Sequence, residues 1–252
     1  MPREARDSRN WFDQGGNAYL RFRPEYPPEL AQFLASLAPG TTQAVDVGCG
    51  NGQLTIRLAA NFGAVLGVDP SAEQIANVTE HPRVEYVRAA AEHLPVADHS
   101  AQLITAAQAA HWFDLPRFYE EVRRVCVPQG VLALISYGVM HLDEELESRF
   151  SRFYWEEIGP YWPEERKFVD SGYADLPFPF EEKPSPRLEI VKKWNLEELL
   201  GYVSTWSAVH RACEAGREDI SQAFAVDLMK LWGSSLQYRQ VRWPINMRLG
   251  TL

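Results

Sequence analysis

The chain has 252 residues, of which 46% are hydrophobic and 23% charged, enough apolar material for a folded core, so disordered and fibrous classes are excluded. Its formal charge of −9 disfavours nucleic acid as a partner, because a phosphate backbone is repelled. No segment approaches the ~18 apolar residues of a membrane span. The three scattered cysteines, Cys49, Cys126 and Cys213, indicate neither a disulfide framework nor a metal site, and we expect a reducing, cytoplasmic setting.

The first predicted elements are a helix and a strand that ends in glycines. Apolar residues at helical spacing predict an amphipathic helix over 27–38, which begins at two prolines. Residues 44–47 have the pattern of a short strand, and the glycine turn at 48–52 separates it from a helix over 53–59. The order is therefore strand, glycine turn, helix.

Strands and helices go on alternating after this turn. Further strands are predicted at 65–68, 84–87, 103–107 and 131–135, with helices between them. Five strands of this kind predict a doubly wound α/β fold, in which a mostly parallel sheet carries helices on both faces.

The chain changes in character after Tyr137. Aromatic residues crowd positions 150–180, which predicts an insertion that either covers a substrate or forms a local hydrophobic cluster. A strand at 188–194, helices at 195–206 and 220–232, and a final strand at 241–247 follow. With the last two strands, the sheet is expected to have seven.

The glycine turn carries the first chemical signal. Gly48, Gly50 and Gly52 follow Asp46 in the pattern Asp-x-Gly-x-Gly-x-Gly. A dinucleotide fingerprint needs glycine at its sixth position, where this chain has Gln53, and this counts against a nicotinamide or flavin cofactor. Glycine at every second position leaves bare backbone for a bulkier ligand, and the Asp46 charge suits a cationic amino-acid group.

Asp69 supplies the second signal, because it ends the second predicted strand 21 positions after Gly48. An acid at this place can accept hydrogen bonds from both hydroxyls of a ribose. Taken alone, an Asp at a strand end is more often a cap, here for the helix that starts near Ser71. Together with the glycine turn, it indicates a nucleoside.

With these residues the chain resembles the class I S-adenosylmethionine-dependent methyltransferases, in the type 11 methyltransferase-domain subgroup. The resemblance rests on segments 45–52, 67–71, 91–95 and 128–132 and covers residues 40–137. It implies S-adenosyl-L-methionine as cofactor, S-adenosyl-L-homocysteine as product and a Rossmann-like methyltransferase sheet. The glycine turn then holds the methionine part, Asp69 the ribose and Ala91 with Glu92 the adenine, although Ala90 stands where many relatives carry Asp. The expected cofactor-binding residues are Tyr19, Arg23, Asp46, Gly48, Gly50, Gly52, Asp69, Pro70, Ala91, Glu92 and Gln108.

A narrower resemblance, to the trans-aconitate and cantharidin methyltransferase-like branch, rests on segments 23–27, 108–114, 205–207 and 243–244. The segment 108–114 follows the fourth predicted strand, where open α/β sheets place ligands, so we expect His111 near the reacting methyl group, either as a general base or as a hydrogen-bond partner of the loop or the cofactor backbone. Arg23 holds either the methionine carboxylate or an acidic substrate, or lies on the surface. The expected substrate-binding residues are Arg23, Tyr26, Trp112 and Trp155.

We therefore expect one methyltransferase domain over 1–252, made of a helical cover (1–39), a cofactor-binding core (40–137), a substrate-covering insertion (138–186) and a C-terminal part that completes the sheet (187–252). The expected reaction is direct displacement of the methyl group by a small-molecule acceptor, with a carboxylate oxygen favoured. A phenol, amine or thiol acceptor with His111 as base is the alternative, and a non-catalytic cofactor-binding protein is a second one. No metal is implied, and a monomer is expected.

Overall fold

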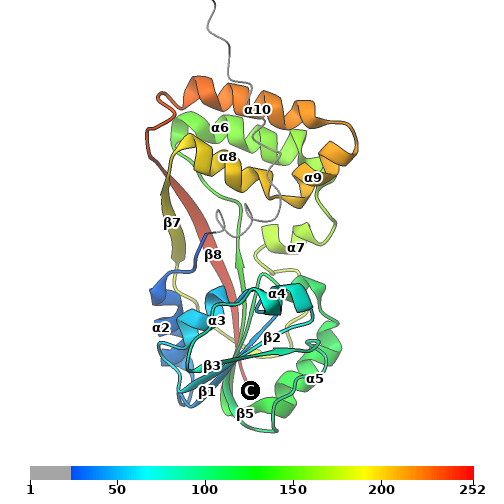
Figure 1. The fold of residues 1–252 in the computed structure, drawn as a ribbon. Coiled ribbons are helices and arrows are strands. Elements are labelled where there is room, and N and C mark those ends of the chain that lie inside the picture. Colours follow the sequence, from blue (N-terminus) through cyan, green and yellow to red (C-terminus); the bar gives the residue numbers. More distant parts are fainter. Residues whose placement is uncertain (1–23) are drawn as a thin grey trace, which may run out of the picture. The chain divides into compact units, whose positions relative to one another are not determined.

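The computed structural model describes residues 24–252, and every structural statement below concerns these residues. Their contacts divide the chain into two compact units, each described by itself (Figure 1). We call residues 25–139, 165–190 and 243–252 the sheet unit, and residues 140–164 and 191–242 the helical unit. The aromatic segment 150–180 is thus divided between both.

The strands described form one sheet of eight, in the order β3-β2-β1-β4-β5-β8-β6, with β7 also paired to β8. The pairs among β1 to β5 are parallel, and β8 runs antiparallel to β5 and β6. This confirms the predicted Rossmann-like α/β class, with one strand more than expected. The strands are β1 (Gln43–Val47), β2 (Ala64–Asp69), β3 (Val84–Arg88), β4 (Ala101–Ala107), β5 (Cys126–Tyr137), β6 (Glu181–Lys183), β7 (Leu188–Trp194) and β8 (Arg239–Thr251).

Helices cover both faces of the parallel strands, which is why those strands are nearly continuous apolar runs. In Figure 1, α2 and α5 flank the strands on opposite sides. The helix α5 starts at its N-cap Asp114 and buries Phe118, Val122 and Val125 against the sheet. The helices of this unit are α2 (Pro28–Leu37), α3 (Gln53–Leu58), α4 (Ala72–Ala76), α5 (Leu115–Val125) and α7 (Arg166–Asp170), with a 3-10 turn η1 (Ala110–Trp112).

The helical unit packs around aromatic side chains. Phe153 stacks on Phe224 with ring centroids 3.9 Å apart, and Trp206 lies against Phe150 and Tyr154. This cluster supports the second interpretation of the aromatic stretch for its first half. The helices are α6 (Glu144–Arg152), α8 (Leu196–Ser204), α9 (Ser207–Glu214) and α10 (Glu218–Leu231), with a π-helical turn η2 (Phe153–Glu157) and a 3-10 turn η3 (Gly159–Tyr161).

Some predicted boundaries were wrong. The helix expected over 195–206 starts at the expected Asn195 capping box but ends at Ser204, and α9 follows it. The strand expected at 131–135 begins earlier, at Cys126. None of the helices described is long and apolar enough to cross a membrane.

Candidate functional site

Most of the predicted cofactor residues that the structure describes come together at one edge of the sheet. The parallel strands β3, β2, β1 and β4 are neighbours, so their carboxyl ends meet at the same edge. The glycine turn follows β1, Asp69 ends β2, and Gln108 follows β4. Open α/β sheets bind ligands at this edge. Every residue of this site belongs to the sheet unit.

The glycine turn has a backbone that requires glycine. Gly48 has φ of +70°, and a Cβ atom added there lies 2.3 Å from the Cβ of Ala109. A Cβ atom at Gly52, where φ is +90°, lies 2.1 Å from the hydroxyl of Tyr86. At Gly50, where φ is +56°, the nearest atom to an added Cβ is the Gln74 side-chain oxygen at 3.7 Å, an ordinary contact, so the middle of the turn is its least crowded part.

Asp69 supports the glycine turn and the residue that caps α4, but the cap itself is Ser71, whose hydroxyl accepts from the Gln74 amide. One carboxylate oxygen accepts from the Gly50 amide at 2.9 Å, and the other accepts from the Ser71 amide at 2.8 Å. A carboxylate offers about four lone-pair sites, so roughly two are left for ligand hydroxyls. Pro70, next to it, is exposed. These two backbone hydrogen bonds and ribose binding are therefore compatible.

Asp46 is held inside the sheet. Its side chain is buried, at 1% exposure, and its two oxygens accept from the hydroxyls of Thr55 and Thr105, each at 2.7 Å. Burial raises the pKa of the Asp46 carboxyl to about 6, although both threonines act in the opposite direction. A contact between Asp46 and the amino group of a cofactor stays a prediction.

The predicted adenine residues and Gln108 are fixed by backbone contacts. An oxygen of Glu92 accepts from the Asp114 amide at 2.8 Å, and Ala91 is buried. Gln108, with φ of +55°, donates from its side-chain amide to the Tyr137 carbonyl at 3.1 Å. Their contacts with adenine or the methyl donor stay predictions.

His111 lies in the 3-10 turn that follows β4. Its Nδ1 atom is 3.0 Å from the hydroxyl of Tyr173, and its ring lies 4.9 Å from the exposed ring of Trp112. Burial, together with the positive charge of Arg166, lowers the pKa of His111 to about 4, against a smaller opposite effect of Glu165. His111 is thus neutral at pH 7.

The sequence analysis missed Tyr173 as the partner of His111. The two residues are 62 positions apart, and Tyr173 lies in the aromatic stretch without any local pattern that distinguishes it. Its position shows that the part of this stretch around Tyr173, which belongs to the sheet unit, packs beside His111. The sequence signal for this pairing was limited to a histidine followed by an aromatic-rich insertion.

Of the remaining predicted residues, Tyr26 is brought to this edge by a described contact, because its partner Tyr137 ends β5 and accepts from Gln108. Tyr19 and Arg23 lie outside the described residues. Tyr26 is buried against the ring of Tyr137, with centroids 6.0 Å apart. Trp155 belongs to the helical unit, where it lines a cavity of about 590 Å³ whose walls, including Arg149, all come from that unit.

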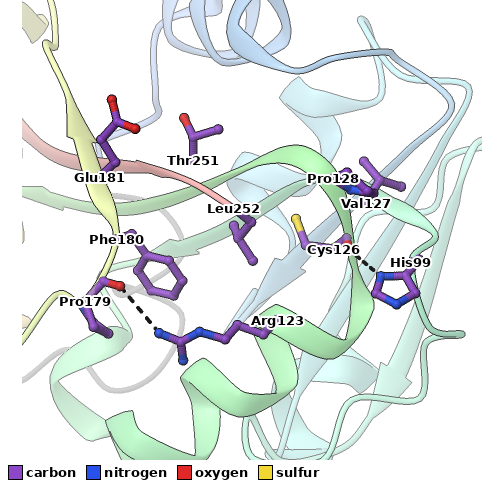
Figure 2. Close-up of a pocket in the computed structure, with 10 residues that line it drawn as sticks. All are labelled: His99, Arg123, Cys126, Val127, Pro128, Pro179, Phe180, Glu181, Thr251 and Leu252. Carbon is purple, nitrogen blue, oxygen red and sulfur yellow. Dashed lines mark hydrogen bonds between the residues drawn. The ribbon is translucent and has the colours of Figure 1, made fainter.

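Another pocket lies at the opposite edge of the sheet, where β5 begins and β8 ends. Its volume is about 420 Å³ (Figure 2). There Arg123 donates to the Pro179 carbonyl at 3.4 Å, and a ring nitrogen of His99 is 3.1 Å from the Cys126 carbonyl. None of the residues predicted to bind cofactor or substrate lines it, so we place the candidate site at the carboxyl edge.

The groups at the carboxyl edge of the sheet are chemically suited to bind S-adenosylmethionine. The backbone at Gly50 is the least crowded part of the glycine turn, and the Asp69 carboxylate that binds its amide retains acceptor sites for ligand hydroxyls. No group of three or more potential metal ligands occurs among the residues described. The parallel α/β sheet, with the glycine turn and Asp69 at its carboxyl edge, is typical of α/β proteins that bind nucleosides.

Comparison with known proteins gives this class a family. A sequence model described as "Methyltransferase domain" matches residues 45–134. A Dictyostelium discoideum protein, provisionally named a methyltransferase, is 36% identical over 245 residues, which are 94% of this chain and 93% of its own. A solved structure from Anaeromyxobacter dehalogenans, provisionally a type II methyltransferase, is 42% identical, with a TM-score of 0.87 over 91% of this chain and 98% of its own. A malonyl-[acyl-carrier protein] O-methyltransferase from Dechloromonas aromatica is 34% identical over 116 residues, which are 43% of this chain and 41% of its own.

The chain belongs to this methyltransferase family, and it is an S-adenosylmethionine-dependent enzyme. The predicted family, cofactor and enzyme class are thereby confirmed. The narrower resemblance to the trans-aconitate and cantharidin branch stays a prediction.

Proposed function

We propose that the enzyme transfers the methyl group to a carboxylate oxygen of a small organic acid. The observation that carries this proposal is the environment of His111, whose pKa is lowered to about 4 by burial and by Arg166. A general base works best when its pKa lies near the working pH, so His111 is poorly suited to deprotonate a phenol or an amine at pH 7. A carboxylate acceptor is ionised at that pH and needs no base.

In this reaction the bound cofactor supplies an activated methyl group on a sulfonium. The protein has to orient donor and acceptor and exclude water, an effect that can be worth ~7–11 kcal/mol. We assign the orientation of the cofactor to the glycine turn and Asp69. The acceptor is expected beside His111 and Trp112, which lie after β4 at the same edge.

Two further observations support an acid rather than a nucleic acid as the acceptor. The relative from Dechloromonas aromatica is named for methylation of an oxygen of a malonyl group, which ends in a free carboxylate. The net charge of −9 argues against nucleic acid as the acceptor. We further propose that the enzyme acts as a monomer and that Arg23, if it holds an acid, adds to binding of the acceptor.

The proposal is tested by a methyl-transfer screen. Purified enzyme and S-adenosylmethionine are incubated with panels of small carboxylic acids, phenols, amines and thiols, and both S-adenosylhomocysteine and methylated product are measured. We expect methyl esters, formed at a rate that is flat between about pH 6 and 8, because a carboxylate titrates near pH 4. Products from phenols, amines or thiols alone, with a rate that follows an ionisation near ~6.5 and loses it in His111→Ala, contradict the proposal.

A further inference from the structure

The hydroxyl of Tyr173 is buried beside the candidate site and needs a hydrogen-bond acceptor for its proton. Tyr173 is 0% exposed, and its side-chain oxygen lies 3.0 Å from Nδ1 of His111. Burial raises the pKa of Tyr173, so the phenol keeps its proton at neutral pH.

A proton count decides the direction of the hydrogen bond between the two side chains. A buried hydroxyl without an acceptor costs free energy, and buried polar groups in folded proteins are rarely left unpaired. Among the residues described, Nδ1 of His111 is the acceptor within reach of the Tyr173 proton. If Nδ1 carried a proton and donated it to the phenol, the hydroxyl proton would be buried without a partner. Tyr173 therefore donates, and Nδ1 accepts.

The neutral ring then carries its proton on the other nitrogen. No residue in the described part of the chain hydrogen-bonds Nε2 of His111, so its N–H is available to a ligand. The charged groups that face the ring are Arg166 and Glu165, and the Arg166 charge disfavours a second proton on the imidazole. The ring thus presents one donor and no acceptor.

We propose that Tyr173 is a positioning residue that fixes His111 as the Nε2–H tautomer, and that this N–H donates a hydrogen bond to the acceptor carboxylate. This inference rests on the proposed function for the identity of the acceptor. It assigns His111 an orienting role and takes proton removal out of the reaction. The carboxylate is held by one lone pair while another oxygen lone pair attacks the methyl group.

Nitrogen-15 NMR of the histidine rings tests the tautomer in the full-length enzyme, with S-adenosylhomocysteine and without acceptor. His111 is assigned by comparison with His111→Gln, and we expect its ring to be neutral and protonated on Nε2 at pH 7. In Tyr173→Phe the donor that stabilises the neutral ring is lost, so the titration midpoint of His111 rises. Tyr119→Phe is the matched control, because it removes another buried tyrosine hydroxyl, which donates to the Pro177 carbonyl at 2.6 Å. A proton on Nδ1 in the wild type, or a midpoint that falls in Tyr173→Phe, overturns the inference.

Kinetics of two substitutions test the donor role. Glutamine keeps an N–H donor but cannot take up a proton at neutral pH, and alanine has neither property. With a carboxylate acceptor, we expect His111→Gln to retain a rate within about tenfold of wild type and His111→Ala to lose about 10- to 100-fold, the effect of one hydrogen bond to a charged group. Equal losses of about 100-fold or more in both variants indicate a base and overturn the inference.

The two experiments also separate this inference from the proposed function. An Nε2–H tautomer in an enzyme that esterifies none of the acids refutes the carboxylate acceptor and supports the tautomer assignment. Methyl esters formed by an enzyme whose His111 is protonated on Nδ1 support the proposed function and refute the role of Tyr173.

Discussion

Asp46 is the buried charge on which the strand β1 depends, and its two threonine partners come from different elements. Thr55 lies on α3 and Thr105 on β4, so the carboxylate joins both to the strand that leads into the glycine turn. Hydrogen bonds to a charged acceptor are worth ~1.5–3 kcal/mol each, and burial of the charge opposes them. The raised pKa of Asp46 shows which effect is larger.

This raised pKa predicts a pH-dependent stability. Because the folded-state pKa is about 6 and the reference value is 3.8, the folded enzyme binds this proton more tightly than the unfolded chain. The contribution to stability is fully present below about pH 4 and is lost as the pH rises through about 6. At 1.36 kcal/mol per pKa unit, the loss is at most ~3 kcal/mol.

Asp46→Asn cannot titrate and provides the comparison. We expect the stability of Asp46→Asn relative to wild type to increase by up to ~3 kcal/mol between pH 4 and pH 7, because only the wild type loses stability over this range. Urea denaturation of both proteins across this range measures it. A difference that does not change with pH would falsify the assignment of the raised pKa to Asp46.

At the scale of single residues, local sequence patterns located the glycines and Asp69, because a turn and a strand end are visible in a few consecutive positions. The partners of these residues were not visible. Thr105 is 59 positions from Asp46, and Tyr173 is 62 positions from His111. Such pairs form only when the sheet brings distant segments together, and one sequence contains no signal for that pairing.

At the scale of elements, the turn between β1 and α3 is where conformation and packing restrict the chain together. Gly48→Ala adds a left-handed backbone penalty of roughly 1–2 kcal/mol and a Cβ contact of 2.3 Å with Ala109, which must be relieved by moving either segment. Gly216→Ala, at the end of α9, has a similar φ of +71° and nothing within 4 Å of the added atom. It therefore isolates the backbone penalty.

We expect Gly48→Ala to cost ~1–3 kcal/mol more than Gly216→Ala in free energy of unfolding, and to weaken cofactor binding, which Gly216→Ala leaves unchanged. Chemical denaturation and calorimetric titration with S-adenosylhomocysteine measure the two effects. Equal destabilisation by the two substitutions contradicts the packing argument, and unchanged cofactor affinity in Gly48→Ala contradicts the place of the turn in the site.

The strands and helices that were predicted well have strong apolar periodicity, as α5 and the parallel strands do. The strand β6 was missed because its residues, Glu-Glu-Lys, are exposed and have no apolar pattern; it is a strand only through its pairing with β8. The break between α8 and α9 was missed for a similar reason, because Trp206 continues the apolar spacing while its ring joins the aromatic cluster of the helical unit. Tertiary packing decides such boundaries.

At the scale of the whole molecule, cofactor binding and folding are linked. A ligand that binds only the native state at 100 times its dissociation constant adds ~2.7 kcal/mol to stability. We expect S-adenosylmethionine and S-adenosylhomocysteine to raise the unfolding temperature, and a nicotinamide dinucleotide to have no effect. In Asp69→Ala we expect this shift to shrink strongly, because the ribose loses charge-assisted hydrogen bonds of ~1.5–3 kcal/mol each.

Asp69→Asn, which retains an acceptor oxygen without the charge, should fall between Asp69→Ala and wild type. The unfolding temperature of each variant without ligand separates the loss of the Gly50 and Ser71 hydrogen bonds from the loss of cofactor contacts. A full ligand shift in Asp69→Ala contradicts the ribose role of Asp69.

The position of β8 in the sheet has a consequence for anyone who cuts this protein into pieces. β8 pairs with β5 from Val131 to Tyr137, although more than a hundred residues separate the two strands. A fragment that ends near residue 139, a few residues beyond the family match, keeps β5 paired with β4 but leaves the other edge of this apolar strand unpaired. An unpaired strand edge of this kind can pair with a strand of another chain, which leads to aggregation. We expect such a fragment to aggregate, and supplying residues 239–252 through a short linker after β5 to restore its solubility.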